Sequence, residues 1–370
     1  MRTRTILAFL ALTALWILAV PAAQAAPTQG DWTLKVGDRA GEIELGLTTD
    51  SGKHRSQHYS TWAVREFEGI GQAMSASNRA SFALVREAGR IDFEGRIDNG
   101  RGSGTFRFTP SPSFARSMES LDFEVDDHHQ FGMALQDVTL EFARQMRSAD
   151  LEDLDSSQLI AFRFHGVSLD YIEAVREAGQ TIRDSKKLVA FRVHGIQPDW
   201  IRSLHRAGYE PSNSKLVAMK VHGVTIPWIE AMAASGIGPL PIEKLIAFRV
   251  HQVTPEMIAA FVDLGYGDLD GSQLVAFRVH DVSPEFVREL DVLGLEPAAS
   301  QLIAMRIHQV TPEFVRGLRD AGAELDISGF ITAKIQGVTP ESVAEARRQG
   351  LRRLDLGGIL DWHHSRRHSS

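Results

Sequence analysis

The chain has 370 residues, a formal net charge of −7 and no cysteine. The missing cysteines exclude thiol catalysis, iron–sulfur clusters and cysteine-bound zinc, and interspersed charges of both signs argue against nucleic acid as the partner. The apolar fraction of 43% is sufficient for hydrophobic cores, which excludes a disordered tether.

Residues 1–26 have the pattern of a signal peptide. Two arginines precede an apolar run over residues 6–20, and small residues occupy the cleavage-site pattern at 23–25. The run is shorter than the about 20 residues that a membrane-spanning helix needs. We therefore expect cleavage and export to the periplasm or the exterior. The alternative is an anchor formed by an uncleaved N-terminal signal, and no later stretch approaches spanning length.

Residues 27–109 are predicted to form a small antiparallel β domain. Apolar and polar residues alternate over 43–47 and 91–97, and Asn99-Gly100 then signals a hairpin. The first helical half-unit follows directly. We therefore expect an edge of the β domain to cap the open start of the repeats and to hide an apolar face.

Residues 110–358 contain tandem repeats of 28 or 29 residues. A glycine ladder and a Ser/Thr ladder run in step with a ladder of histidines, and the outermost copies are degenerate. Three ladders in register predict stacked units that bury their apolar faces against one another. The histidines are His165, His194, His222, His251, His280 and His308.

The second half of each unit is predicted to be a helix of about ten residues. In one copy Thr311 can cap the backbone N–H groups, Pro312 suits the first helical position, and Gly322 ends the helix in a left-handed conformation. An aromatic residue near the start of this helix recurs, and we expect these rings to form a continuous core. They are Phe142, Tyr171, Trp200, Trp228, Phe286 and Phe314.

The first half of each unit is ambiguous. Residues 300–308 alternate like a strand, which would give a leucine-rich-repeat-like solenoid of strands and helices. In several copies, however, glycine and valine follow the histidine, as in a Schellman helix ending. We favour a helix, so the fold class is mainly α: a short-helix solenoid of helix-turn-helix repeats preceded by the β domain.

An arginine or lysine stands two residues before every ladder histidine. One interpretation is structural: the cation pairs with an acid of the following helix, such as Asp199 or Glu285, and the histidine donates to a turn carbonyl. On this interpretation we expect His251→Ala to lower thermal stability. The alternative is a cationic stripe that binds an anionic ligand or an acidic partner segment. This candidate binding stripe consists of Arg163, His165, Arg192, His194, Lys220, His222, Arg249, His251, Arg278, His280, Arg306 and His308.

No metal or other cofactor is expected. Neighbouring histidines of the ladder would lie about 10 Å apart across packed helices, whereas zinc needs ligand atoms at about 2.0–2.1 Å. No His-Glu-x-x-His motif and no Ser–His–acid order stands out, so no catalytic residue is assigned. Residues 359–370 are predicted to be a flexible tail rich in histidine and arginine.

Two stretches carry a resemblance to known proteins: "GRIDFEGRIDNGRGSGTFRFTPSPSFARSM" and "LIAFRVHQVTPEMIAAFVDLGYGDLDGSQ". They resemble repeat-bearing extracytoplasmic extensions of β-lactam-sensing antirepressor metallopeptidases, and the likeness covers nearly all of residues 30–355. The resemblance implies a regulatory or interaction role outside the cytoplasm. The peptidase half, with its His-Glu-x-x-His, is absent from this sequence.

The leading functional hypothesis is a non-enzymatic exported scaffold that binds a protein or an envelope polymer through its repeat surface. The alternatives are an envelope hydrolase with a site between the β domain and the repeats, and a sensor partner of an antirepressor-type signalling system. A cleft with a convergent acid, base and nucleophile would favour the hydrolase, and an open lined face would favour binding.

Overall fold

A computed structural model describes residues 29–50, 55–75 and 79–367. The predicted signal peptide lies outside these residues. The described chain divides into two compact units: the first runs to Ile172 and includes Arg183–Val189, and the second includes Glu173–Ile182 and continues from Ala190. No helix in the described part combines the length and the apolar character that crossing a membrane requires.

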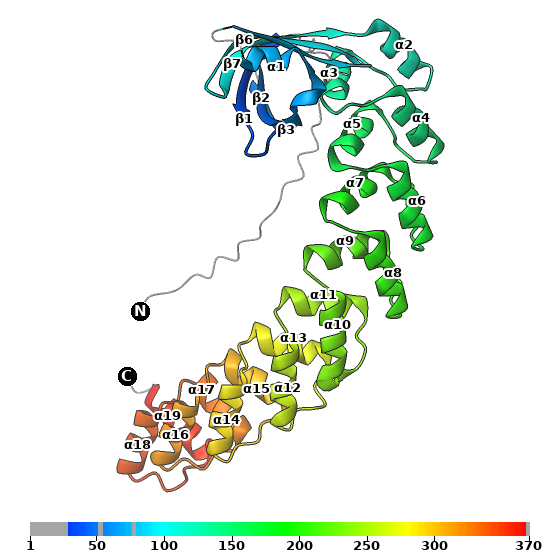
Figure 1. The fold of residues 1–370 in the computed structure, drawn as a ribbon. Coiled ribbons are helices and arrows are strands. Elements are labelled where there is room, and N and C mark those ends of the chain that lie inside the picture. Colours follow the sequence, from blue (N-terminus) through cyan, green and yellow to red (C-terminus); the bar gives the residue numbers. More distant parts are fainter. Residues whose placement is uncertain (1–28, 51–54, 76–78, 368–370) are drawn as a thin grey trace. The chain divides into compact units, whose positions relative to one another are not determined.

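One antiparallel sheet opens the first unit (Figure 1). Its strands lie in the spatial order β3-β2-β1-β7-β6-β5-β4. The predicted hairpin is confirmed, because Asp98 pairs with Arg101 across Asn99 and Gly100, both at positive φ. The strands are β1 (Gln29–Val36), β2 (Glu42–Asp50), β3 (Arg55–Ala63), β4 (Phe67–Glu68), β5 (Ala80–Arg86), β6 (Gly89–Asp98) and β7 (Arg101–Pro110).

The sheet curls because its two edge strands are consecutive in the chain. Only the short helix η1 (Val64–Glu66) separates β3 from β4, and the rings of Trp62 and Phe67 lie 5.6 Å apart across this join. Helix α1 (Ile70–Ser75) packs beside β5. The curl encloses a core of aromatic and aliphatic side chains, among them Trp32 and Phe93, which are 1% and 0% exposed.

The first helical repeat packs on the sheet, as expected, but on its face and not on an edge. Helix α3 (Asp127–Leu135) contacts β6 and β7. The Phe131 ring lies 5.7 Å from that of Phe106 and 5.3 Å from that of Phe108. This packing explains why the first compact unit extends beyond the predicted boundary at residue 109.

The repeats are helical in both halves, which confirms the mainly α fold and makes the strand alternative wrong. The described residues contain nine first-half and nine second-half helices. The first-half helices are α3, α5 (Ser156–His165), α7 (Ser185–Val193), α9 (Asn213–Val221), α11 (Ile242–Val250), α13 (Gly271–Val279), α15 (Ala299–Ile307), α17 (Ile327–Ile335) and α19 (Leu356–Arg367).

Each second-half helix lies on the other side of its repeat. Within the second unit, first-half helices pack on first-half neighbours and second-half helices on second-half neighbours, in two layers (Figure 1). A π-helical turn, η2 (Ala233–Ile237), follows α10. The second-half helices are α2 (Pro112–Glu119), α4 (Leu140–Ser148), α6 (Leu169–Glu177), α8 (Pro198–Arg206), α10 (Ile226–Met232), α12 (Pro255–Asp263), α14 (Pro284–Val292), α16 (Pro312–Asp320) and α18 (Pro340–Arg348).

The predicted helix signals are confirmed at both ends. Thr311 caps α16 by accepting a hydrogen bond from the backbone N–H of Phe314, and Gly322 follows this helix at φ 97°. The first-half helices end in Schellman turns: the backbone N–H of Val253 donates to the carbonyl of Phe248 at 2.8 Å, and Val282 donates likewise to Phe277.

The recurrent aromatic residues are less central than predicted. Phe286 and Phe314 are 5% and 8% exposed, whereas Trp200 and Trp228 are only partly buried. The deepest positions are elsewhere in both helices. They include Leu216, Met219, Leu245, Phe248, Leu274, Phe277, Leu302 and Met305 of the first-half helices, all at most 1% exposed.

The prediction of a flexible tail from residue 359 is wrong for the described part. Helix α19 reaches Arg367 and packs against α17 and α18, and the side chain of Ile359 is 1% exposed. The buried isoleucine covers the last repeat, as a terminal unit with one neighbour requires. Residues 368–370 lie outside the described chain.

One position after each first-half helix offers a stability test. Gln309 and Gln252 hold positive φ there, at 57° and 56°, where four other repeats have glycine and two have aspartate. Gln252 accepts a hydrogen bond from Arg278 at 3.3 Å, whereas the described residues show no side-chain bond for Gln309. We expect Gln309→Gly to raise the free energy of unfolding by about 0.5–1 kcal/mol, because it relieves left-handed strain.

The matched control is Gln252→Gly, which relieves the same strain and removes a hydrogen bond. It should stabilise less than Gln309→Gly in urea denaturation of the two variants. An equal or larger gain at Gln252 would show that the side-chain bond contributes nothing.

Candidate functional site

The cations of the candidate binding stripe lie between repeats. In four of the arginines the guanidinium Nε donates a hydrogen bond to the carbonyl of the C-cap residue of the preceding first-half helix. These carbonyls have no partner within their own helix, so the arginine satisfies them. The observed pairs are Arg163 with Gln136 (3.1 Å), Arg249 with His222 (3.1 Å), Arg278 with His251 (3.3 Å) and Arg306 with His280 (3.4 Å).

The same cations cover the recurrent aromatic rings. Four of them, together with the equivalent Lys334 of α17, lie over the aromatic ring near the start of the second-half helix of the preceding repeat, a cation–π arrangement. Burial lowers the pKa of the Lys220 ammonium in this position. The distances to the ring centroids are 5.3 Å for Arg163 over Phe142, 4.3 Å for Lys220 over Trp200, 5.1 Å for Arg249 over Trp228, 5.0 Å for Arg306 over Phe286 and 4.5 Å for Lys334 over Phe314.

The acid partners expected for these cations are wrong. Asp199 and Glu285 pair within their own helices, Glu285 with Arg288 at 3.1 Å. The pKa of the Glu285 carboxyl is lowered chiefly by a bond from its own backbone N–H and then by the Ser283 hydroxyl. A helix N-terminus therefore holds this carboxylate, and it does not turn back to the arginine.

Three of the ladder histidines, His222, His251 and His280, act through their backbone. Their carbonyls accept the arginine bonds, which the imidazole ring does not take part in. Burial lowers the pKa of His165 in the first unit, whereas His222, His251 and His308 of the second unit are exposed. Within the described ranges, no three His, Asp or Glu side chains gather in a metal-binding arrangement.

The sequence analysis missed a further ladder, which is formed by the residue between each cation and its histidine. The residue directly after each rung cation is apolar, and it is exposed. We call the six such residues of the second unit the apolar ladder; Phe164, 61% exposed, is their equivalent in the first unit. The apolar ladder consists of Val193 (44% exposed), Val221 (55%), Val250 (48%), Val279 (56%), Ile307 (51%) and Ile335 (54%).

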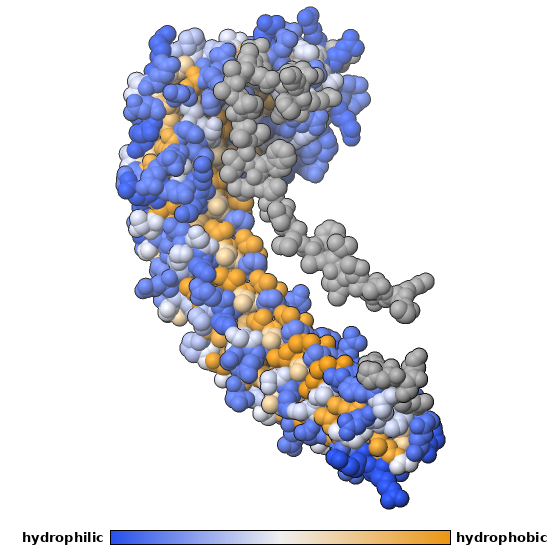
Figure 2. Space-filling view, turned by 180° about the vertical axis from the view of Figure 1, so that it is seen from behind, coloured by the Kyte–Doolittle hydropathy of each residue, from blue (hydrophilic) through white to orange (hydrophobic). Residues whose placement is uncertain are grey.

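A half-buried apolar residue lies one helical turn before each rung of the apolar ladder. Val275 precedes Val279, and Ile303 precedes Ile307, so both members of a pair share one face of their helix. Because the first-half helices stack in one layer, these pairs line up across repeats. Figure 2 shows the result as a band of hydrophobic residues that runs along the repeats.

The sequence did carry a signal for this surface. In first-half helices such as Gly271–Val279 the apolar residues are spread around the helix and do not form one stripe, a pattern that favours burial on more than one side. Here only the side with Leu274 and Phe277 is buried, and Val279 faces outward. A row of half-exposed branched side chains of this regularity is unusual on a soluble surface, where exposed apolar residues are normally scattered.

Charge separates the two helix layers of the second unit. Helices α9, α11, α13, α15 and α17 carry seven Lys or Arg residues and one acid, Glu243, which pairs with Lys215 at 3.1 Å. Helices α8, α10, α12, α14, α16 and α18 carry eleven acids and seven arginines. The apolar ladder therefore lies in the cationic layer of a chain whose net charge is negative.

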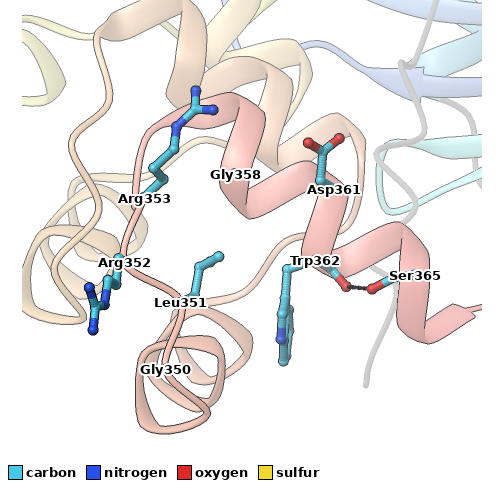
Figure 3. A pocket seen from close by; sticks show the side chains of 8 residues that line it. All are labelled: Gly350, Leu351, Arg352, Arg353, Gly358, Asp361, Trp362 and Ser365. Atoms are coloured by element: carbon cyan, nitrogen blue, oxygen red, sulfur yellow. Dashed lines mark hydrogen bonds between the residues drawn. The ribbon is translucent and has the colours of Figure 1, made fainter.

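An open hollow of about 540 Å³ lies between the end of α18 and α19 (Figure 3). Leu351 and Trp362 lie beside it, and Arg352 and Asp361 point in different directions. Arg353 is held by Asp355 at 2.9 Å. The polar side chains around this hollow do not converge on one point, so they do not form a set of catalytic groups. The hollow is also not the site between the β domain and the repeats that the hydrolase hypothesis names.

Comparison with known proteins adds no assignment: the chain matches no family model, and the search of curated proteins gives no match.

Proposed function

We propose that the protein is an exported, non-enzymatic scaffold that binds a protein or envelope component through its repeats, and that the apolar ladder is its binding surface. The single observation that carries the proposal is the row of six apolar side chains, each between 44% and 56% exposed, at the same position of consecutive repeats. Covering such a row with a partner removes apolar area from water, which favours binding by about 25 cal/mol per Å² before the costs of association.

In this proposal the candidate binding stripe of arginines and histidines has a structural role. Its arginines already cap helices and cover aromatic rings inside the array, so they first stabilise the stacking of repeats. The valine and isoleucine side chains of the apolar ladder do not stabilise the stacking of repeats in this way, since about half of each side chain faces solvent. A repeat array with one regular exposed row is suited to a long partner that contacts several repeats.

The resemblance to antirepressor extensions supports the proposal of an extracytoplasmic regulatory role, in which the signalling partner would be a separate chain. Export rests on the signal-peptide pattern of residues 1–26. The envelope hydrolase of the alternative hypothesis lacks a supporting observation in the described residues.

The test compares two sets of serine variants. Val250→Ser/Val279→Ser/Ile307→Ser removes three rungs of the apolar ladder. Val262→Ser/Val292→Ser removes apolar side chains that are 41% and 83% exposed on α12 and α14, away from the ladder. Both should fold, because half-exposed surface substitutions change the free energy of unfolding by about 0.5 kcal/mol each.

The partner is cross-linked in envelope extracts of the producing cells, identified, purified and titrated against each variant. We expect the ladder variant to bind at least about tenfold more weakly than wild type, and the control to bind like wild type. Equal affinity of the ladder variant and wild type contradicts the proposal, as does the absence of any cross-linked partner for the wild-type chain.

A further inference from the structure

We propose that the occupant of the apolar ladder is an extended acidic protein segment in a polyproline II-like conformation, with an apolar residue at every third position. This inference rests on the proposed function and deepens it, because it states the chemistry of the partner. Two independent properties of the surface lead to it: the spacing of the rungs and the charge of the layer that carries them.

The spacing follows from the packing of the first-half helices. Helices α9, α11, α13, α15 and α17 contact one another in sequence, and packed helices lie about 8–10 Å apart. Each helix carries its exposed rung at the same position, so we expect the side chains of Val250, Val279 and Ile307 to recur at about this helix-packing distance.

A polyproline II segment has the matching period. It rises about 3.1 Å per residue with three residues per turn, so every third side chain returns to the same face after about 9 Å. A β-strand repeats each face after about 6.6 Å and loses register within two rungs. An α-helix matches through residues seven apart, at about 10.5 Å, and drifts from the rungs as it crosses several repeats.

The positive charge of the first-half helix layer indicates which residues the partner segment carries between its apolar residues. Seven cations and a single acid lie on these five helices; the acid Glu243 pairs with Lys215, and Arg306 pairs with Asp281, which follows α13. Hydrogen bonds from Arg249 and Arg278 to neutral carbonyls leave the guanidinium charge uncompensated. Carboxylates beside the apolar residues of the partner complement this charge, and lysines in the same place are repelled.

The experiment titrates the purified, processed chain with synthetic 18-residue peptides. The probe is six copies of Pro-Glu-Val, which places a valine at every third position. Its matched controls are six copies of Pro-Lys-Val, six copies of Pro-Glu-Ser, a Pro-Glu-Glu-Val repeat that shifts the spacing to four, and a helical acidic peptide with valine at every seventh position. Vesicles of an anionic phospholipid form a separate arm.

We expect the Pro-Glu-Val peptide to bind at least about tenfold more tightly than every control, to lose that advantage on the Val250→Ser/Val279→Ser/Ile307→Ser chain, and to weaken several-fold between 50 and 500 mM salt. Equal binding of the lysine peptide overturns the charge assignment, and equal or tighter binding of the four-spaced or helical peptide overturns the extended conformation.

The two proposals fail in different ways. If no peptide binds while the cross-linked partner still depends on the ladder, the inference about its chemistry is wrong and the proposed function remains. If vesicles bind through the ladder in place of peptides, the surface is a membrane contact and the inference is again wrong. If neither peptides nor the extract partner depend on the ladder, both proposals are wrong.

Discussion

Phe277→Ala is expected to cost about 3–5 kcal/mol of local stability and to open the repeats around α13. The phenyl ring is 0% exposed, and it lies 4.9 Å from the Phe261 ring in an edge-to-face arrangement. Removing it leaves a cavity that the neighbouring helices fill only in part. Because each repeat contacts only its neighbours, the loss should remain confined to those repeats.

Hydrogen exchange read by mass spectrometry measures this better than one melting temperature, since repeat arrays depart from two-state unfolding. We expect faster exchange in α11–α15 and unchanged exchange in β6 and β7. Val279→Ala, two residues further on and 56% exposed, is the matched control and should change local stability by less than about 0.5 kcal/mol. Accelerated exchange throughout the chain would contradict the picture of repeats coupled only to their neighbours.

Arg306→Ala is the second substitution with a large expected effect: it should lower the free energy of unfolding by about 1–3 kcal/mol. The side chain, 28% exposed, donates to the carbonyl of His280, pairs with Asp281 and lies over the Phe286 ring. Its loss leaves the end of α13 without a partner for that carbonyl and uncovers the ring. The screened ion pair with Asp281 adds little, because Asp281 is exposed.

Two variants separate the contributions. Arg306→Lys keeps the charge over the ring, as Lys334 does over Phe314 at 4.5 Å, and loses the Nε donor, so its cost should be intermediate. His251→Ala, which the sequence led us to expect to be destabilising, should cost less than about 0.5 kcal/mol, because alanine supplies the same carbonyl to Arg278. Urea denaturation followed by circular dichroism tests the series, and a loss at His251 as large as at Arg306 would restore the importance of the imidazole.

The sequence determined the repeat, the helix ends and the hairpin. Thr311, Gly322 and Asn99-Gly100 act through backbone groups a few residues away, so their signals can be interpreted without knowing the rest of the fold. The periodic ladders also located the boundaries of the repeats, since a repeat that is copied keeps its register whatever it packs against.

Only the tertiary structure decided what the ladders do. The carbonyl that Arg306 caps stands 26 residues earlier, and no local pattern shows that two stacked units bring them together. The exposure of Val279 was equally hidden, because a helix whose apolar residues are spread around it looks the same in sequence whether one face or several are covered. The burial of a side chain and its hydrogen-bond partners depend on which surfaces meet, and the packing of neighbouring repeats sets this.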